Sequence, residues 1–366
     1  MPEADKRVSA AEDVPEPRDL PAFWKSRLED TEQEIRQVRL GEVKQVATSP
    51  GGLPVYAVFY GEKDDLRSQA NYNSALGALN PAYYAQKTES TKPVVFFLGP
   101  VHGQEVELIV GVVNLIHILD TGQDHRGKQW PELKARAERC RVIAVPCANP
   151  DGRRRVPYDS FLGLPWAIVP KYGQGTHKDG TLWGWPGCKA RHPMRGDVGI
   201  LGGYYNDDGI NPMHDDFFGR MAQETDAIVD IARTEAPDIA VSLHACDQLP
   251  FLIQTQSVPA HIKHRIADIS RRVKERLESE GLPAERALPY PEPEAPTKLP
   301  MPGFNLNDAV HYVSGATAFT FETFHGTLTE KYPEAIVTHD DLLDILLCLF
   351  DELLLYALEN PVRWEL

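Results

Sequence analysis

The chain has 366 residues, of which 42% are hydrophobic, so it is long enough to bury a core in one large domain or two ordinary ones. Its formal net charge of -15 argues against nucleic acid or an anionic membrane surface as a partner, because like charges repel. Its five cysteines are odd in number and include no CxxC pair, which indicates reduced thiols of a cytoplasmic protein.

The sequence lacks the signals that would indicate several other classes of protein. Residues 1–21 contain no apolar run of the kind found in secretory signal peptides. The longest apolar tract, 342–358, contains three acidic residues, so it predicts a core helix and not a membrane span. The chain has no GxSxG, P-loop or GxGxxG motif, which leaves serine hydrolases and nucleotide-binding proteins without support.

The N-terminal part predicts an arm and a hairpin. Residues 1–40 are polar and contain prolines before a helical pattern, so we expect them to form an arm and a helix appended to one main domain, 41–366. Two short β-rich runs, 43–48 and 54–60, are joined by Ser-Pro-Gly-Gly, which favours a hairpin. The polar residues that follow, 61–92, predict a long loop with room for one helical turn.

The most informative stretch is 93–119. An uncharged run at 94–98 predicts a strand covered on both faces, and a Gly-Pro turn then leads through His102-Gly-Gln-Glu105 into an apolar helix. Open α/β folds place their sites at the carboxyl ends of strands. A histidine and a glutamate three residues apart can bind one zinc ion there. The alternative is that Glu105 only caps the helix and His102 is an ordinary loop residue.

The middle of the chain predicts a strand and then a long loop. Residues 141–148 form a second buried run, which ends in the turn sequence Asn-Pro-Asp-Gly at 149–152. From 153 to 215 the chain has no helical or strand periodicity but is rich in Gly, Pro, Trp and Tyr. Its three tryptophans argue against disorder, so we expect a packed loop that walls a pocket.

The last third of the chain predicts two more strands that carry polar residues. One buried run leads directly into His244, and a later one delivers Glu322. The proline-rich segment 289–302 predicts a semi-rigid loop or lid. The remaining expected elements are helices at 217–234 and 261–280, strands at 238–243, 251–254 and 318–321, and a closing helix capped by Thr338.

Two histidines and one glutamate form a set of ligands that suits a catalytic zinc ion. His102, Glu105 and His244 would leave a fourth position for water, and zinc lowers the pKa of a bound water to about 7. A nearby carboxylate that does not bind the ion can accept the proton of this water, and Glu322 is the candidate. Alternatively, His244 is a core histidine and Glu322 an acid at a strand end.

In these motifs and in their order the chain resembles the M14 zinc carboxypeptidases over residues 41–360. The resemblance implies a single α/β domain with a mixed, mostly parallel eight-stranded sheet and helices on both faces. It also implies one zinc ion held by His102, Glu105 and His244, with Glu322 as the general base. The segments that carry it are the hairpin, HGQE at 102–105, NPDG at 149–152, SLHA at 242–245 and FTFET at 319–323.

The substrate-binding segments depart from the family pattern. Arg191, or else Arg195, is nearest to the arginine with which the family polarises the scissile carbonyl. Met213 and His214 stand where the family has the Asn-Arg pair that binds the substrate's terminal carboxylate. Histidine offers fewer and more pH-dependent donors than the bidentate fork of arginine. The family's mobile tyrosine has two possible counterparts, Tyr290 and Tyr312.

These observations predict a cytoplasmic zinc-dependent hydrolase of the carboxypeptidase type, which cleaves an amide bond in a peptide or an amino-acid conjugate. The missing Asn-Arg pair keeps a second function open, a deacylase acting on a small conjugate without the usual C-terminal carboxylate. A third possibility is a zinc protein that binds a partner without catalysis, although such a protein would gain nothing from retaining Glu322. The sequence does not identify the substrate or the oligomeric state.

Overall fold

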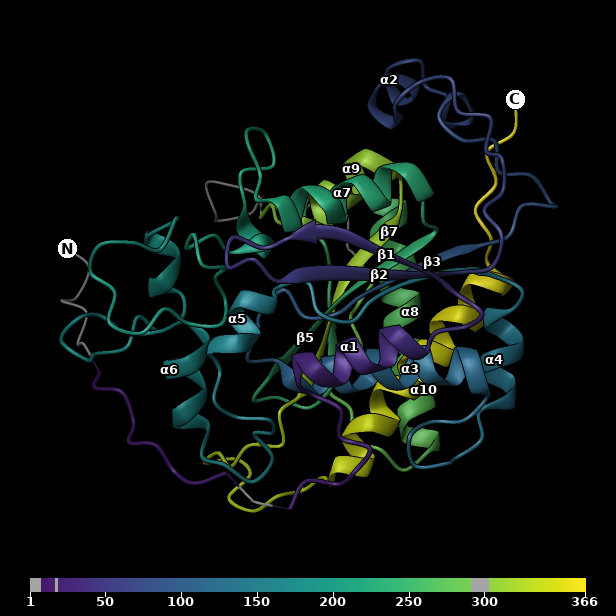
Figure 1. Ribbon diagram of the computed structural model, residues 1–366. Helices are drawn as coiled ribbons and strands as arrows, with labels where there is room; N and C mark the ends of the chain where they lie inside the picture. Colours follow the sequence, from purple (N-terminus) through teal and green to yellow (C-terminus); the bar gives the residue numbers. More distant parts are fainter. Residues whose placement is uncertain (1–7, 17–18, 291–302) are drawn as a thin grey trace.

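A single mixed sheet forms the centre of the computed structural model, which describes residues 8–16, 19–290 and 303–366 (Figure 1). Its strands follow the order β1-β2-β4-β3-β5-β7-β6, with β3, β4, β5 and β7 parallel and the others antiparallel. The described residues contain seven strands, where the resemblance implied eight. The strands are β1 (Glu42–Thr48), β2 (Pro54–Tyr60), β3 (Val94–Leu98), β4 (Arg141–Val145), β5 (Ile239–Cys246), β6 (Phe251–Ile253) and β7 (Thr317–Phe324).

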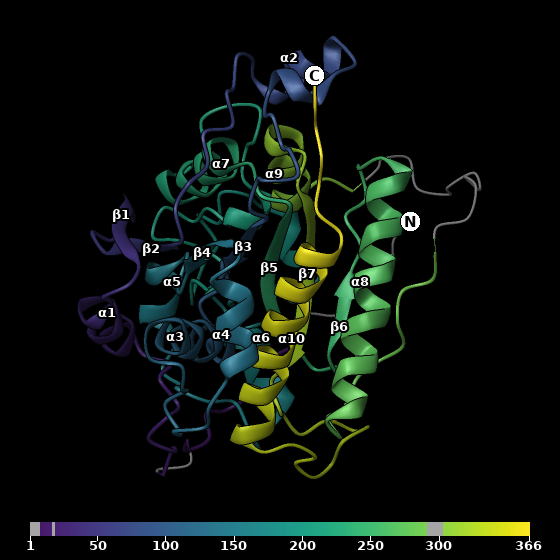
Figure 2. The same ribbon diagram turned by 90° about the vertical axis from the view of Figure 1, so that its right-hand side faces the viewer.

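Helices cover both faces of this sheet, which confirms the α/β fold (Figures 1 and 2). α7 and α9 pack on one face, whereas α3, α4, α8 and α10 pack on the other, and α1 lies on α3. The helices are α1 (Leu28–Gln37), α2 (Tyr72–Gly77), α3 (Val106–Thr121), α4 (Pro131–Ala137), α5 (Pro150–Arg155), α6 (Val169–Gly173), α7 (Gln223–Glu235), α8 (Ala260–Ser279), α9 (Leu306–Ser314) and α10 (His339–Glu359).

The central strand β3 explains why both layers form. All five of its residues are buried, and alternate side chains enter opposite cores because successive strand residues point to opposite faces. Val95 and Phe97 pack in the core under α3 and α10, whereas Phe96 packs in the core under α7 and α9. The helix predicted from the apolar tract near the C-terminus is α10, capped by Thr338 as expected. Among the described residues, no helix is both long and apolar enough to cross a membrane.

Two local predictions need correction, and one helix was missed. The helix expected from residue 217 begins at Gln223, because the Asp215 carboxylate accepts a hydrogen bond from the backbone of Ala222 (2.8 Å) and holds the preceding residues in turns. The turn expected at 149–152 opens the short helix α5, because the Asn149 side chain caps it through the backbone N–H of Gly152 (2.9 Å). Helix α9 was not predicted. Most of the proline-rich segment, 291–302, lies outside the described residues.

The N-terminal arm lies along the long loop that follows α5. Ser9 pairs with Thr181 in an isolated β-bridge, and the carboxylate of Asp13 accepts hydrogen bonds from Lys171 (2.9 Å) and Tyr172 (2.8 Å). The arm and α1 therefore pack on the same domain as the sheet. The long loop itself folds into short helical turns, including α6, and Trp166 and Trp183 pack against small apolar clusters within it, whereas Trp185 is exposed.

One buried acid near the start of α7 predicts how stability depends on pH. Burial raises the pKa of Glu224 to about 7, from an ordinary value of 4.5, although its own backbone amide and the side chain of Asn206 (3.3 Å) donate hydrogen bonds to it. Between these values the folded state keeps a proton that the unfolded state has lost. The free energy of unfolding should therefore fall by roughly 3 kcal/mol as the pH rises through this window, and change no further above it.

Denaturation of Glu224→Gln at several pH values checks this prediction. The free energy of unfolding of this uncharged variant should not fall with pH. Relative to the wild-type protein, the variant should therefore become more stable as the pH rises from 4.5 to 7. Glu330→Gln, a substitution at an exposed acid, is the matched control and should follow the wild type. The prediction is wrong if Glu224→Gln and the wild type keep a constant difference in stability across this range.

Candidate metal centre

Three of the predicted side chains meet at the carboxyl ends of the parallel strands. His102 follows β3, Glu105 precedes α3, and His244 lies in β5. The two oxygens of Glu105 lie 2.9 Å from Nδ1 of His102 and 3.2 Å from Nδ1 of His244. All three side chains are buried, and their ligand atoms lie within 4.8 Å of one another. The turn between β3 and α3 and the strand β5 therefore direct three donor groups toward one point.

The outer nitrogens of both imidazoles are occupied by neighbours. Nε2 of His102 lies 3.2 Å from Oδ1 of Asn211, and Nε2 of His244 lies 3.1 Å from the hydroxyl of Ser242. The ring of Tyr204 stacks on His102 with a centroid distance of 3.8 Å. Such contacts hold metal-binding histidines in position and fix their tautomers.

The hydrogen bonds of Asn211 decide where the proton of His102 lies. Oδ1 of Asn211 already accepts a hydrogen bond from the backbone of Met213 (2.9 Å), which identifies this atom as the oxygen. Nε2 of His102 must therefore donate to it, and in the neutral ring Nδ1 is left with a lone pair facing the Glu105 carboxylate. A second proton or a metal ion must lie between these two atoms. Burial lowers the pKa of His102, which disfavours the second proton.

The ring orientations also fit a metal ion. The planes of His102 and His244 cross at 69°, an orientation in which both Nδ1 atoms can face one ion. Burial alone would raise the pKa of Glu105, but the two histidines outweigh it and hold this pKa at about 2. An ionised carboxylate and two imidazole nitrogens form a donor set that suits zinc.

Glu322 lies beside this cluster without belonging to it. Its residue is the cross-strand partner of His244, since β5 and β7 run parallel in this register. Both residues lie inside their strands and not after them, because β5 and β7 extend further than predicted. Burial raises the pKa of Glu322 to about 7, although the nearby His244 opposes the shift. At neutral pH this carboxyl group can therefore both accept and donate a proton.

The two predicted arginines do not join the cluster. Arg191 is exposed and donates to the backbone carbonyl of Arg195 (2.6 Å). Arg195 donates to the carbonyl of Asp208 (3.0 Å) and lies 3.5 Å from its carboxylate. Both guanidinium groups are thus engaged within the long loop.

His214 is near enough to the cluster for His102 and His244 to affect its pKa. It ends a short helical turn, Pro212–His214, whose capping residue Asn211 also binds His102. Burial, together with the nearby Lys189, His102 and His244, lowers the pKa of His214 to about 3. His214 is therefore neutral at pH 7.

The two candidate tyrosines have other neighbours. Tyr290 lies against His264 of α8 (5.7 Å between ring centroids), and Tyr312 stacks on Phe304 beside α9 (6.1 Å). Both side chains are about half exposed. The contacts of these two tyrosines connect them to helices and not to the His102 cluster.

The structure adds a buried ion pair that the sequence did not reveal. Nδ1 of His325 lies 3.1 and 3.2 Å from the two oxygens of Glu107, and both side chains are completely buried. Glu107 lies in the first turn of α3 and His325 directly follows β7. The pair therefore joins the helix that follows Glu105 to the strand that carries Glu322. The residues are too far apart in sequence for any local pattern to predict it.

Known structures share this arrangement of elements, although no protein-family model and no curated protein sequence match the chain. A metallo-carboxypeptidase from Burkholderia cenocepacia superposes on 91% of this chain and 69% of its own, with a TM-score of 0.53 and 12% identity. Thrombin activatable fibrinolysis inhibitor covers 94% of this chain and 81% of its own, with a TM-score of 0.51 and 12% identity. The chain has the metallo-carboxypeptidase fold. At this identity the likeness concerns the fold alone, so the roles of individual residues depend on the geometry described above.

A close backbone approach at Gly103 yields a test of the site's geometry. A Cβ atom on Gly103 would lie 2.0 Å from the backbone nitrogen of Arg153, so Gly103→Ala must displace the turn that carries His102. This displacement moves the donor atom of His102 away from Glu105 and His244, and a shift of about 1 Å is enough to disrupt such a site. We expect Gly103→Ala to lose bound zinc, as measured by metal analysis. Gly187→Ala, where a Cβ meets nothing within 4 Å, is the control. Zinc binding at the wild-type level by Gly103→Ala would contradict the described turn.

Proposed function

We propose that the protein is a zinc-dependent hydrolase of the carboxypeptidase type, which cleaves an amide bond in a peptide or amino-acid conjugate. The observation that carries this proposal is the lone pair of His102 Nδ1 facing the buried Glu105 carboxylate at 2.9 Å. His102, Glu105 and His244 would hold the ion. The fold shared with metallo-carboxypeptidases supports the same conclusion.

Each residue has a separate task in the proposed reaction. His102, Glu105 and His244 would hold the zinc ion, which when bound would lower the pKa of a water molecule to about 7. Glu322, with a pKa of about 7, is the residue that accepts a proton from the attacking water and returns it to the leaving amine. Asn211 and Ser242 keep the two imidazoles oriented through their outer nitrogens.

The substrate side of the site supports a second candidate, a deacylase acting on a conjugate without a terminal carboxylate. Arg191 and Arg195 are bound to carbonyls of their own loop, and His214 is neutral at pH 7. None of the three therefore offers a free, permanently charged fork to a carboxylate. For Arg191 to polarise the substrate carbonyl, as we propose, its loop must rearrange when substrate binds.

The proposal also includes the family to which the protein belongs and its location in the cell. The order of the motifs from 102 to 323 supports membership of the M14 zinc carboxypeptidases. A cytoplasmic location is supported by the five cysteines, all of which are free and four of which are buried.

Replacing Glu322 tests the proposed base. Glu322→Gln cannot accept a proton, so we expect kcat to fall by about 10²- to 10⁴-fold while the zinc content stays unchanged. The measurement pairs hydrolysis kinetics with metal analysis of the same sample. Glu330→Gln, at an exposed position, should keep wild-type kinetics. Unchanged hydrolysis by Glu322→Gln would exclude this residue as the base.

A paired substrate pool separates the two candidate functions. Peptides with free C-termini and the same peptides amidated are incubated with zinc-loaded protein, and the products are read by mass spectrometry. The contacts of the arginines within their own loop favour a site that does not recognise the terminal carboxylate. In that case both pools should be cleaved at similar rates. Trimming of the free pool alone would show that the carboxylate is recognised and would reject the deacylase. His214→Ala should then raise KM for the free pool if His214 contacts that carboxylate.

A further inference from the structure

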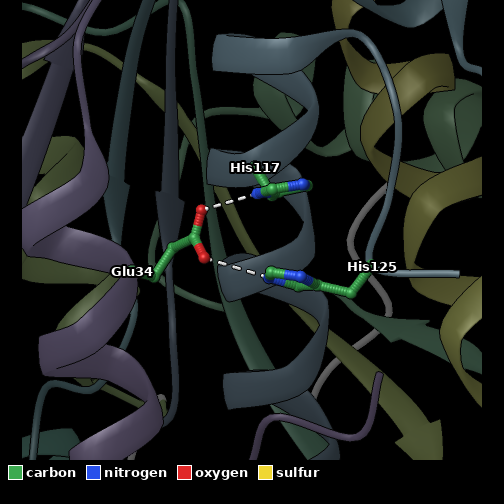
Figure 3. A group of neighbouring side chains, drawn as sticks. All are labelled: Glu34, His117 and His125. Atoms are coloured by element: carbon green, nitrogen blue, oxygen red, sulfur yellow. Dashed lines mark hydrogen bonds and ion pairs between the residues drawn. The ribbon is translucent and has the colours of Figure 1, made fainter. Parts of the chain in front are cut away.

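A second cluster of ligand-type side chains lies away from the catalytic strand ends. Glu34 of α1, His117 of α3 and His125 of the following loop gather with their polar atoms facing one another (Figure 3). One oxygen of Glu34 lies 3.0 Å from Nδ1 of His117, and the other lies 3.0 Å from Nε2 of His125. Glu34 is buried, and the two histidines are only partly exposed.

The backbone around this cluster is held in place by buried contacts. The amide of His125 donates to Oδ1 of Asn114 (3.0 Å), a completely buried residue one turn before His117 on α3. Helix α1 packs directly on α3, so Glu34 faces the same side of that helix. Three segments of the chain therefore present these groups together.

The charge of Glu34 has no fixed counter-ion. Among the described residues its ion pairs are with the two histidines alone, and no lysine or arginine pairs with it. Burial takes the carboxylate of Glu34 largely out of water, where an ionised group needs a partner of opposite charge. Such a charge is stabilised by a cation.

We propose that Glu34, His117 and His125 form a second zinc site, separate from the candidate catalytic centre. Two imidazole nitrogens and a carboxylate oxygen are zinc ligands, and tetrahedral coordination at about 2.0–2.1 Å places ligand atoms about 3.3 Å apart. Each hydrogen-bonded pair of donors here lies 3.0 Å apart, a few tenths of an ångström closer than this ligand spacing. The partial exposure of both histidines lets water complete the coordination.

Binding an ion requires the two rings to turn. They stack at a centroid distance of 4.0 Å and an angle of 23°, whereas the rings of His102 and His244 cross at 69°. An ion must lie close to the plane of each ring that binds it, so nearly parallel rings cannot both bind it. His125 belongs to a loop and not to a helix, so its ring is the one that turns. The occupied site would fasten α1 to α3.

Counting bound zinc tests this second site directly. Protein loaded with zinc and then desalted should hold two ions per chain by metal analysis. His117→Ala combined with His125→Ala should hold one, and so should His102→Ala combined with His244→Ala. His261→Ala, at an exposed histidine of α8, is the control and should hold two. The proposal is overturned if the wild type holds one ion and the His117/His125 double variant also holds one.

A thermal scan keeps the test decisive if removal of the histidines unfolds the chain. In the His102/His244 double variant, which lacks the candidate catalytic ligands, zinc should still raise Tm in proportion to occupancy of the second site. Addition of Glu34→Gln to that variant should abolish the zinc effect while the hydrogen-bonding shape of the side chain remains. If zinc does not change Tm in the His102/His244 double variant, the Glu34 cluster is only a set of hydrogen bonds between α1 and α3 and does not bind zinc. Neither readout depends on hydrolysis, so failure of the proposed function would leave this test intact.

Discussion

Glu105 carries a negative charge at a place that solvent hardly reaches, and the surrounding architecture is arranged to stabilise that charge. Two imidazoles approach its two oxygens from different strands of the sheet. Each imidazole is in turn held by a neighbour on its outer nitrogen. A buried carboxylate is stable only when such partners are present, so the position of Glu105 limits where β3, β5 and the long loop can lie.

The parallel strands deliver this arrangement through their register. β3 and β5 are neighbours in the sheet, and β5 and β7 are neighbours on the other side, so their polar residues meet at one edge. The same register sets Glu322 beside His244 without making it a ligand of the cluster. The buried Glu107–His325 pair then connects α3 to the end of β7. The candidate base and the candidate ligands are thus held by one continuous set of buried contacts.

The sequence revealed those parts of the site that depend on strands. The strand at 94–98 was predicted with its observed bounds because five consecutive apolar residues end in a Gly-Pro turn. The polar residues of β5 and β7 could be assigned in the same way. Asn211 and Tyr204 could not be found, because their contacts with His102 arise from the folding of a loop that has no periodicity. Glu34, His117 and His125 come from an appended helix, a core helix and a loop, and no spacing relates them.

The central claim is that hydrolysis depends on zinc held by His102, Glu105 and His244. The most direct measurement removes the metal with a chelator, returns zinc in stepwise amounts, and follows cleavage of the peptide pool by mass spectrometry. We predict that the metal-free protein is inactive and that activity returns as the catalytic ligands are filled. In His102→Ala combined with His244→Ala, added zinc should restore nothing. Hydrolysis that persists without metal, or that returns in this double variant, would contradict the proposed mechanism.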